Sequence, residues 1–276
     1  MEFWEIIKAI FLGIVEGITE WLPVSSTGHM IVFDEFVKLK ISAEFKEMFF
    51  VVIQLGAILA VPVLFFDKLN PFSKKKSESE KKSCFSLWGK VIVGAVPAAL
   101  IGFLLDDFFD EHFYNYIVVA IALIVYGVAF ILVEKFNKGK SYRVNDVEAL
   151  SYKDALVIGS FQILSLVPGT SRSGSTILGG MLIGVSRTAA AEFSFFMAIP
   201  IMLGASGLKI LKFIADGFTA TGAEIGLLFI GIAVSFLVSL AAIKFLMDFV
   251  KKHSFSPFGV YRIILGIFVL SFFLIR

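Results

Sequence analysis

Residues 16–29 read Glu-Gly-Ile-Thr-Glu-Trp-Leu-Pro-Val-Ser-Ser-Thr-Gly-His and form the first of two polar stretches. Residues 168–176 read Pro-Gly-Thr-Ser-Arg-Ser-Gly-Ser-Thr. Both stretches gather hydroxyls, glycines and a proline between long apolar segments; the first adds two acids and a histidine, the second an arginine. Carboxylates, hydroxyls, imidazole and guanidinium groups are the ones that bind and cleave phosphate esters. We therefore expect the rest of the chain to bring the two stretches together.

The composition places both stretches in a membrane protein. Apolar residues make up 58% of the 276 residues, the mean hydropathy is +0.88, and 32 residues are phenylalanine. Soluble domains contain only about 45–50% apolar residues. The net charge of +2 gives no reason to expect a nucleic-acid partner, and the single cysteine excludes an internal disulfide. The sequence thus predicts one polytopic, all-helical membrane domain over residues 1–276.

Six apolar runs, one of them short, can be assigned to membrane-crossing helices, which need roughly 17–25 residues each. Two further regions, 3–44 and 154–187, each hold two half-length apolar pieces separated by a turn rich in Pro, Gly and Ser. Broken helices persist at membrane depth only where protein or a water-filled cavity satisfies the freed backbone groups. We therefore expect two re-entrant helix pairs, beside spans at 46–66, 91–105, 116–133, 188–210, 225–247 and 259–275.

Loop charge predicts the orientation. Lysine and arginine gather in three expected loops, 67–90, 134–153 and 248–262, the last including Arg262. The positive-inside rule places these loops in the cytoplasm and the acidic segment 106–115 outside. The first broken pair then enters from the outside and the second from the cytoplasm.

The two halves of the chain resemble each other at an offset near 146 residues. Gly13-x-x-Glu16 before Pro23 matches Gly159-x-x-Gln162 before Pro168. Each half would hold one re-entrant pair and three spans, and because three is odd the two halves would be inverted relative to each other. Such repeats place binding sites at the repeat interface. The predicted repeats are residues 1–135 and 150–276, joined by a cytoplasmic loop at 136–149.

Glu16 and Glu20 are four residues apart and share one face of a helix. Carboxylates are costly in hydrocarbon and usually face an interior cavity. They could hydrogen-bond backbone groups at the broken helix end. We favour a paired role, either binding a divalent cation or orienting a base. Two carboxylates suit Mg²⁺ or Ca²⁺ bridged to a phosphate, because hard divalent cations prefer carboxylate oxygens.

Ser25, Ser26 and Thr27 follow the helix-breaking Pro23. Hydroxyls and free N–H groups at a helix start form an anion site, although an ordinary N-cap would explain one serine. His29 is the histidine expected at membrane depth beside these hydroxyls, and we favour a catalytic role for it over that of a satisfied core histidine.

Arg172 lies between Ser171 and Ser173 at membrane depth, where a cation needs an anionic partner. Its planar fork suits phosphate; the alternative is an ion pair with one of the two glutamates. Gln54, inside the expected span 46–66, could either donate hydrogen bonds to the site or pack against a neighbouring helix.

These motifs resemble those of the undecaprenyl pyrophosphate phosphatase family, the BacA/UppP type linked to bacitracin resistance. The family's hallmarks stand here as Glu16 to Glu20, Pro23 to His29 and Pro168 to Gly174, and the resemblance extends over essentially the whole chain. It implies an enzyme of the bacterial inner membrane that hydrolyses undecaprenyl pyrophosphate to undecaprenyl phosphate and so recycles the lipid carrier of cell-wall synthesis. It also implies a divalent metal, interdigitated inverted repeats, a homodimer and an active site open to the outside.

Carried over by position, the family's site comprises Glu16, Glu20, Ser26, Thr27, His29, Ser171, Arg172 and Ser173. The mechanism that we expect has Ser26 as nucleophile, His29 as its base and Glu20 orienting either the base or the metal. Ser25 and a metal-activated water stay open as alternative nucleophiles. A transporter or flippase of a polyprenyl phosphate lipid is the alternative function, since inverted repeats with broken helices are typical of carriers.

Overall fold

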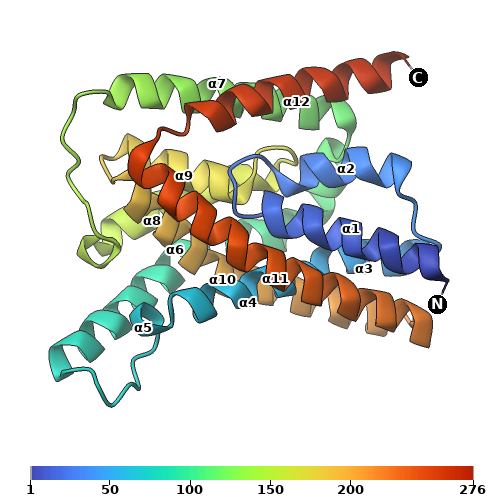
Figure 1. Ribbon diagram of the computed structural model, residues 1–276, viewed down its shortest axis with the longest axis horizontal. Coiled ribbons are helices and arrows are strands. Elements are labelled where there is room, and N and C mark those ends of the chain that lie inside the picture. Colours follow the sequence, from blue (N-terminus) through green and yellow to red (C-terminus); the bar gives the residue numbers. More distant parts are fainter. Residues whose placement is uncertain (1, 276) are drawn as a thin grey trace.

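The computed structural model describes residues 2–275, apart from the side chains of residues 106, 107 and 110. The secondary-structure elements of this range are helices. One isolated β-bridge joins Val144 and Val185. In chain order the elements (Figure 1) are α1 Phe3–Thr19, α2 Ser26–Phe36, α3 Ala43–Val52, α4 Gln54–Leu64, α5 Phe66–Leu69, α6 Glu78–Phe113, α7 Tyr116–Asn137, η1 Val147–Ala149, α8 Tyr152–Gln162, η2 Ile163–Leu166, α9 Arg172–Leu182, α10 Arg187–Ala215, α11 Gly222–Lys252 and α12 Ser256–Ile275.

Six helical segments within the described residues are long and apolar enough to cross a membrane, which confirms the predicted multi-pass architecture. Each overlaps one predicted span. They cover Ala43–Leu64, Glu78–Leu105, Tyr116–Asn137, Arg187–Ala215, Gly222–Lys252 and Ser256–Ile275.

The predicted start of the second span is wrong, whereas its predicted end at residue 105 coincides with the end of the membrane-crossing segment Glu78–Leu105. The helix α6 starts at Glu78, in the middle of the expected loop 67–90, because Ser77 and Glu80 form a capping box that ends the loop there. It then runs through most of the acidic segment expected as a loop and ends at Phe113, with non-helical backbone angles at Leu105. Several acidic side chains of that segment lie outside the described part of the structure.

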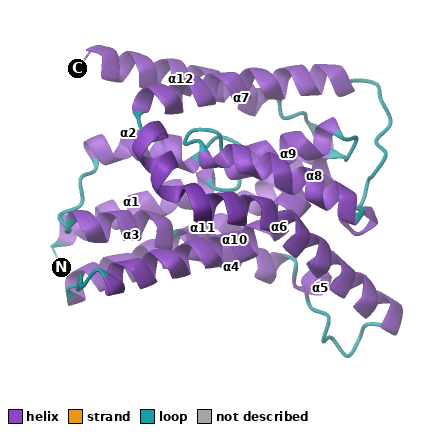
Figure 2. Cartoon of the chain, turned by 180° about the vertical axis from the view of Figure 1, so that it is seen from behind, coloured by secondary structure: helices purple, strands orange, loops and turns teal. Residues whose placement is uncertain are grey.

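Helices of one half pack on helices of the other. The helix α1 lies along α11, α8 lies along α6, and α7 lies along α12 (Figures 1 and 2). Glycines permit the first two contacts: a Cβ added at Gly13 would lie 2.8 Å from the carbonyl oxygen of Gly231, and one at Gly159 would lie 2.0 Å from that of Gly94. Gly13 and Gly159 occupy matching positions of the predicted repeat. The inverted relation itself stays a prediction.

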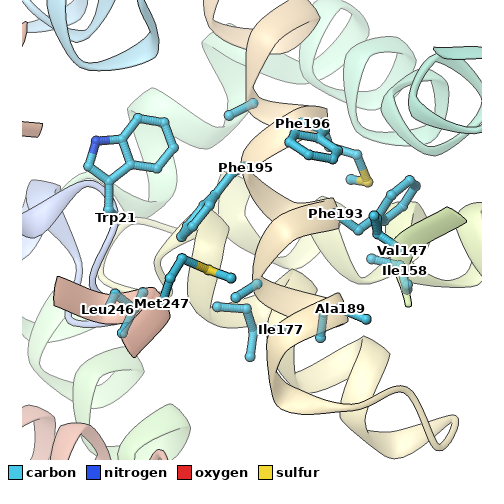
Figure 3. Packing of buried hydrophobic residues seen from close by; sticks show 14 of the residues in the cluster. Trp21, Val147, Ile158, Ile177, Ala189, Phe193, Phe195, Phe196, Leu246 and Met247 are labelled. Atoms are coloured by element: carbon cyan, nitrogen blue, oxygen red, sulfur yellow. The ribbon is translucent and has the colours of Figure 1, made fainter. Parts of the chain in front are cut away.

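The largest hydrophobic cluster includes Trp21 and Val24 of the turn that follows α1. Trp21 is fully buried there and packs edge-to-face on Phe195 of α10, with ring centroids 5.1 Å apart (Figure 3). Phe193, Phe196 and Met197 of the same helix are also fully buried. Burying such large side chains contributes roughly 1.5–3 kcal/mol each, so the turn that follows α1 has a fixed support.

The two broken segments lie toward opposite ends of the molecule. The helices α1 and α2 lie toward the end that carries both termini, whereas α8 and α9 lie toward the end with the 138–151 connection (Figure 1). This arrangement brings the turn after α1 and the turn before α9 toward the middle of the structure.

Candidate active site

Two turns with similar backbone geometry precede the helices α2 and α9 of the candidate site. Ser25 and Ser171, 146 positions apart, are the N-caps of α2 and α9 and have φ angles of 73° and 72°. Their hydroxyls accept hydrogen bonds from the N–H groups of Gly28 at 3.2 Å and Gly174 at 3.1 Å. A left-handed conformation at a residue other than glycine costs on the order of 1–3 kcal/mol and occurs preferentially at functional sites.

Glu20 joins the two polar stretches. Its Oε2 accepts a hydrogen bond from the Ser26 hydroxyl at 2.8 Å, and its Oε1 forms an ion pair with Nη2 of Arg172 at 3.1 Å. Its backbone carbonyl accepts from the Ser173 hydroxyl at 3.1 Å. The Glu20 carboxylate is only 6% exposed. The ion pair considered for Arg172 in the sequence is therefore present, and its partner is Glu20.

Arg172 also contacts α10 and Trp21. Its Nη1 donates to the carbonyl of Ser194 on α10 at 2.8 Å, and its guanidinium carbon lies 5.9 Å from the ring centre of Trp21. The Nε atom has no hydrogen-bond partner among the described residues. The guanidinium is therefore held in one orientation by acceptors on two different segments, Ser194 and Glu20.

Glu16 is 1% exposed, and its Oε1 is a buried oxygen without a hydrogen-bond partner in the part of the chain that the structure describes. The carboxyl group interacts electrostatically with Glu20 and Arg172. Two adjacent carboxyl groups with a spare oxygen fit a hard divalent cation. The described residues contain no cluster of three or more His, Cys, Asp or Glu side chains that could hold a metal ion by themselves. Substrate oxygens would have to complete such a site.

A cavity of about 760 Å³ leads to this cluster. Glu16, Ser26, Thr27 and Gln54 all line it, so the structure places Gln54 on the cavity wall. The wall continues to the turn between α6 and α7 and to the last turns of α12, toward the end of the molecule that carries both termini (Figure 1). Charged side chains line the cavity as well, among them the ion pairs Lys46–Asp34 and Lys209–Glu47.

His29 is held away from Ser26. Its Nδ1 lies 2.7 Å from the carbonyl oxygen of Ser25, and its Nε2 lies 2.6 Å from the hydroxyl of Tyr261. A carbonyl only accepts, so Nδ1 carries a proton, and in the neutral imidazole Nε2 then accepts from Tyr261. The two rings also stack, with an interplanar angle of 6°. The expected Ser26–His29 contact is absent from the hydrogen bonds of the described residues, where Ser26 instead bonds to Glu20.

Comparisons with known proteins assign the chain to a family. A family model described as bacitracin resistance protein BacA matches residues 9–268. The chain belongs to this family. It is 57% identical to an undecaprenyl-diphosphatase of Enterococcus faecalis over 274 residues, which cover 99% of both chains. It is 58% identical to an undecaprenyl-diphosphatase of Desulfitobacterium hafniense over 277 residues, covering 100% of this chain and 99% of the relative. It is 59% identical to that of Acetivibrio thermocellus, with 98% of each chain covered.

The resemblance to the BacA family is thus confirmed, and the structure brings most of the residues carried over from it into one cluster. Glu16, Glu20, Ser26, Arg172 and Ser173 are linked by direct interactions. The other three lie nearby. Thr27 lines the cavity, and His29 contacts the backbone of Ser25. The hydroxyl oxygens of Ser171 and Ser173 are 3.2 Å apart.

Sequence reasoning missed Arg262 of this BacA-family chain. The assignment of Arg262 to a cytoplasmic loop is wrong: it lies in α12, is 0% exposed, and binds backbone carbonyls of both turns. The helix begins at Ser256, so Arg262 is nearly two turns inside it. A signal was available, because an arginine inside an apolar span is costly and usually has a specific partner.

Proposed function

We propose that this chain hydrolyses undecaprenyl diphosphate, also called undecaprenyl pyrophosphate, to undecaprenyl phosphate and inorganic phosphate. The reaction would recycle the lipid carrier of cell-wall synthesis and confer bacitracin resistance. The names of the close relatives support this function. The observation that carries it is the Glu20 carboxylate, which connects a hydroxyl nucleophile on one turn to an arginine on the other beside a cavity.

The diphosphate would lie between the starts of α2 and α9. Both helices are 11 residues long, and their first N–H groups and dipoles favour an anion at this point. Arg172 would transfer part of its hydrogen bonding from Glu20 to the phosphate oxygens. Phosphoryl transfer depends mainly on such positioning and charge stabilisation.

Ser26 would attack the terminal phosphorus. Its proton would pass to Glu20 Oε2, the atom to which its hydroxyl is already bonded at 2.8 Å. The bond from phosphorus to the bridging oxygen would break, undecaprenyl phosphate would leave, and the phosphoryl group would remain on Ser26. Water would then attack the phosphorus of this phosphoserine, the bond between Ser26 Oγ and phosphorus would break, and Glu20 would return its proton to Oγ as inorganic phosphate leaves. The structure thus favours Glu20 over His29 as the proton acceptor in our proposal.

Glu16 and Glu20 would hold the divalent cation, Mg²⁺ or Ca²⁺. Bound there, the cation would neutralise charge on the diphosphate oxygens. The spare buried oxygen of Glu16 supports this assignment. Mg²⁺ is usually bound through one or two carboxylates together with substrate phosphates, and Glu16 and Glu20 would supply two.

The predicted topology completes the proposal. The cavity leads toward the end with both termini, away from the lysine-bearing turn between α5 and α6 (Figure 1). If that turn is cytoplasmic, as its charge predicts, the site opens to the outer face of the bacterial plasma membrane. The packing of α1 on α11 and of α8 on α6 supports inverted, interdigitated repeats, with α1–α2 and α8–α9 as re-entrant pairs. A homodimer is part of the expectation from the family.

The function is tested by phosphate release from undecaprenyl diphosphate by purified protein in detergent, with Mg²⁺, with Ca²⁺ and with EDTA. We expect release with a divalent cation and its loss with EDTA. Arg172→Ala should lower kcat by about 100- to 1,000-fold, the usual cost of removing one preorganised contact to transition-state charge. Folded protein without release under any metal would contradict the proposal and direct attention to transport of the lipid phosphate.

Tyr261→Phe should lower kcat by up to about tenfold, because it removes one hydrogen bond worth about 0.5–1.5 kcal/mol and leaves the stacked ring in place. Phosphate release by the purified variant measures the effect. Tyr116→Phe is the matched control: Tyr116 lines the cavity, stacks on Phe273, and forms no hydrogen bond to a histidine among the described residues. Equal activity of the two variants would show that the bond to His29 has no part in the reaction.

A further inference from the structure

Arg262 binds both turns of the site at once. Its Nη1 donates to the carbonyl of Pro23 at 3.1 Å, and its Nη2 donates to the carbonyls of Gly169 at 2.8 Å and Thr170 at 2.9 Å. The side chain is completely buried, and its guanidinium carbon lies 5.8 Å from the ring centre of Tyr126. One planar group on α12 therefore spans the gap between two turns that belong to different halves of the chain.

The two turns are bound at matching positions. Pro23 and Gly169 are 146 residues apart, the same offset that separates Ser25 from Ser171. In each turn the bound carbonyl lies two residues before the serine with the left-handed backbone. Arg262 thus fixes the same point of each strained turn, directly ahead of the residue that starts the helix.

The partners of Arg262 are unusual for a buried cation. Within the described residues its hydrogen bonds go to backbone carbonyls, and none of the ion pairs involves it. A buried charge without a carboxylate is costly. A fork with several fixed donors is, however, the side chain that can satisfy carbonyls from two turns simultaneously. Gly174 leaves room for it, because a Cβ there would lie 3.3 Å from Nη1.

We propose that Arg262 is a positioning residue of the active site. By holding Pro23 and Gly169 to one guanidinium, it sets the separation of the two turns, and this separation allows Ser26 and Arg172 to meet at Glu20. The inference rests on the proposed function, since the geometry that it fixes is that of the phosphatase site. Arg262 itself touches neither Glu20 nor Ser26 in the hydrogen bonds of the described residues.

The test compares Arg262→Met and Arg262→Lys with wild type in the phosphate-release assay, recording kcat, KM and the melting temperature in detergent. We expect kcat to fall about 100-fold in Arg262→Met, the cost typical of a displacement near 1 Å in a reacting geometry. Arg262→Lys keeps the charge but has no fork, so it should recover only part of kcat. Arg187→Met is the control, because Arg187 makes a bidentate ion pair with Glu134 outside the two turns. It should lower the melting temperature and leave kcat within about threefold of wild type, since it removes an ion pair from the scaffold.

A double-mutant cycle separates positioning from general support of the fold. If Arg262 acts through the arrangement of Arg172, then Arg262→Met should cost little further activity in an Arg172→Ala background, because residues that act as a unit are non-additive. The proposal is overturned if Arg262→Met keeps kcat near the wild-type value. Additive losses, or a full rescue by Arg262→Lys, would also overturn it. A wild-type protein that releases no phosphate would contradict the proposed function instead.

Discussion

Ser26→Ala should lower kcat for phosphate release by about a thousandfold or more, whereas Ser25→Ala should retain most of it. Ser26 lines the cavity and donates its hydroxyl proton to Glu20 at 2.8 Å, which is the geometry of an activated nucleophile. Loss of a covalent serine nucleophile has cost on the order of 10⁶-fold in kcat in a well-studied protease. Steady-state kinetics of the purified variants measures the difference.

Ser25 is the control for Ser26 because it is the neighbouring serine with a structural task. It is 1% exposed, and its hydroxyl accepts from the N–H of Gly28 as the N-cap of α2. Removing such a cap typically costs about 1 kcal/mol of stability, which a melting curve would report. Near-normal turnover by Ser26→Ala would rule out the covalent route and leave a metal-activated water as nucleophile. A complete loss in Ser25→Ala, with a wild-type melting temperature, would move the nucleophile to Ser25.

Gly159→Ala should destabilise the protein by about 1–3 kcal/mol or more, the cost of overpacking a close contact. The added Cβ would lie 2.0 Å from the carbonyl oxygen of Gly94 and 2.7 Å from its carbonyl carbon, so two helix backbones would have to separate. The contact joins α8 to α6, and α8 leads into the turn that carries Thr170 and Ser171. We therefore expect loss of activity together with loss of stability, measured as melting temperature and phosphate release.

Gly204→Ala, in contrast, should not destabilise the protein. Gly204 lies inside α10, and a Cβ there would have no heavy atom within 4 Å. Alanine is better than glycine in a helix interior by about 1 kcal/mol, so this variant should be at least as stable as wild type. Equal melting temperatures for Gly159→Ala and Gly204→Ala would contradict the close α8–α6 packing.

The sequence predicts the membrane-spanning helices well and their ends less well. Apolar runs are local, and all six predicted spans overlap helices of the structure. The start of α6 was missed because its capping box, Ser77 with Glu80, lies in a lysine-rich stretch whose charge indicated a loop. A helix that leaves the apolar region has no hydropathy signal, and only its cap and backbone hydrogen bonds define it.

The chemical groups of the site were also predictable, whereas their pairing was not. Glu16, Glu20, Ser26 and Arg172 stand out because charges and clustered hydroxyls are costly between apolar segments. The spacing of Ser26 and His29 favoured a direct contact. The structure instead places the His29 ring between the Ser25 carbonyl and Tyr261, a residue 232 positions away. The spacing of two residues in the sequence does not show whether a residue from another helix, here Tyr261, will bind one of them instead.

The sequence by itself determined the class of protein, the spans and the reactive groups, since each depends on the residue's own chemistry and on near neighbours. Only the tertiary structure decided that Glu20 binds Arg172, 152 positions away, as well as Ser26, and that Arg262 binds Pro23 and Gly169 from a third segment. Those contacts follow from close helix packing at small residues such as Gly159 and from the buried support of Trp21 on α10. They are properties of the packed whole, because no single segment contains both partners.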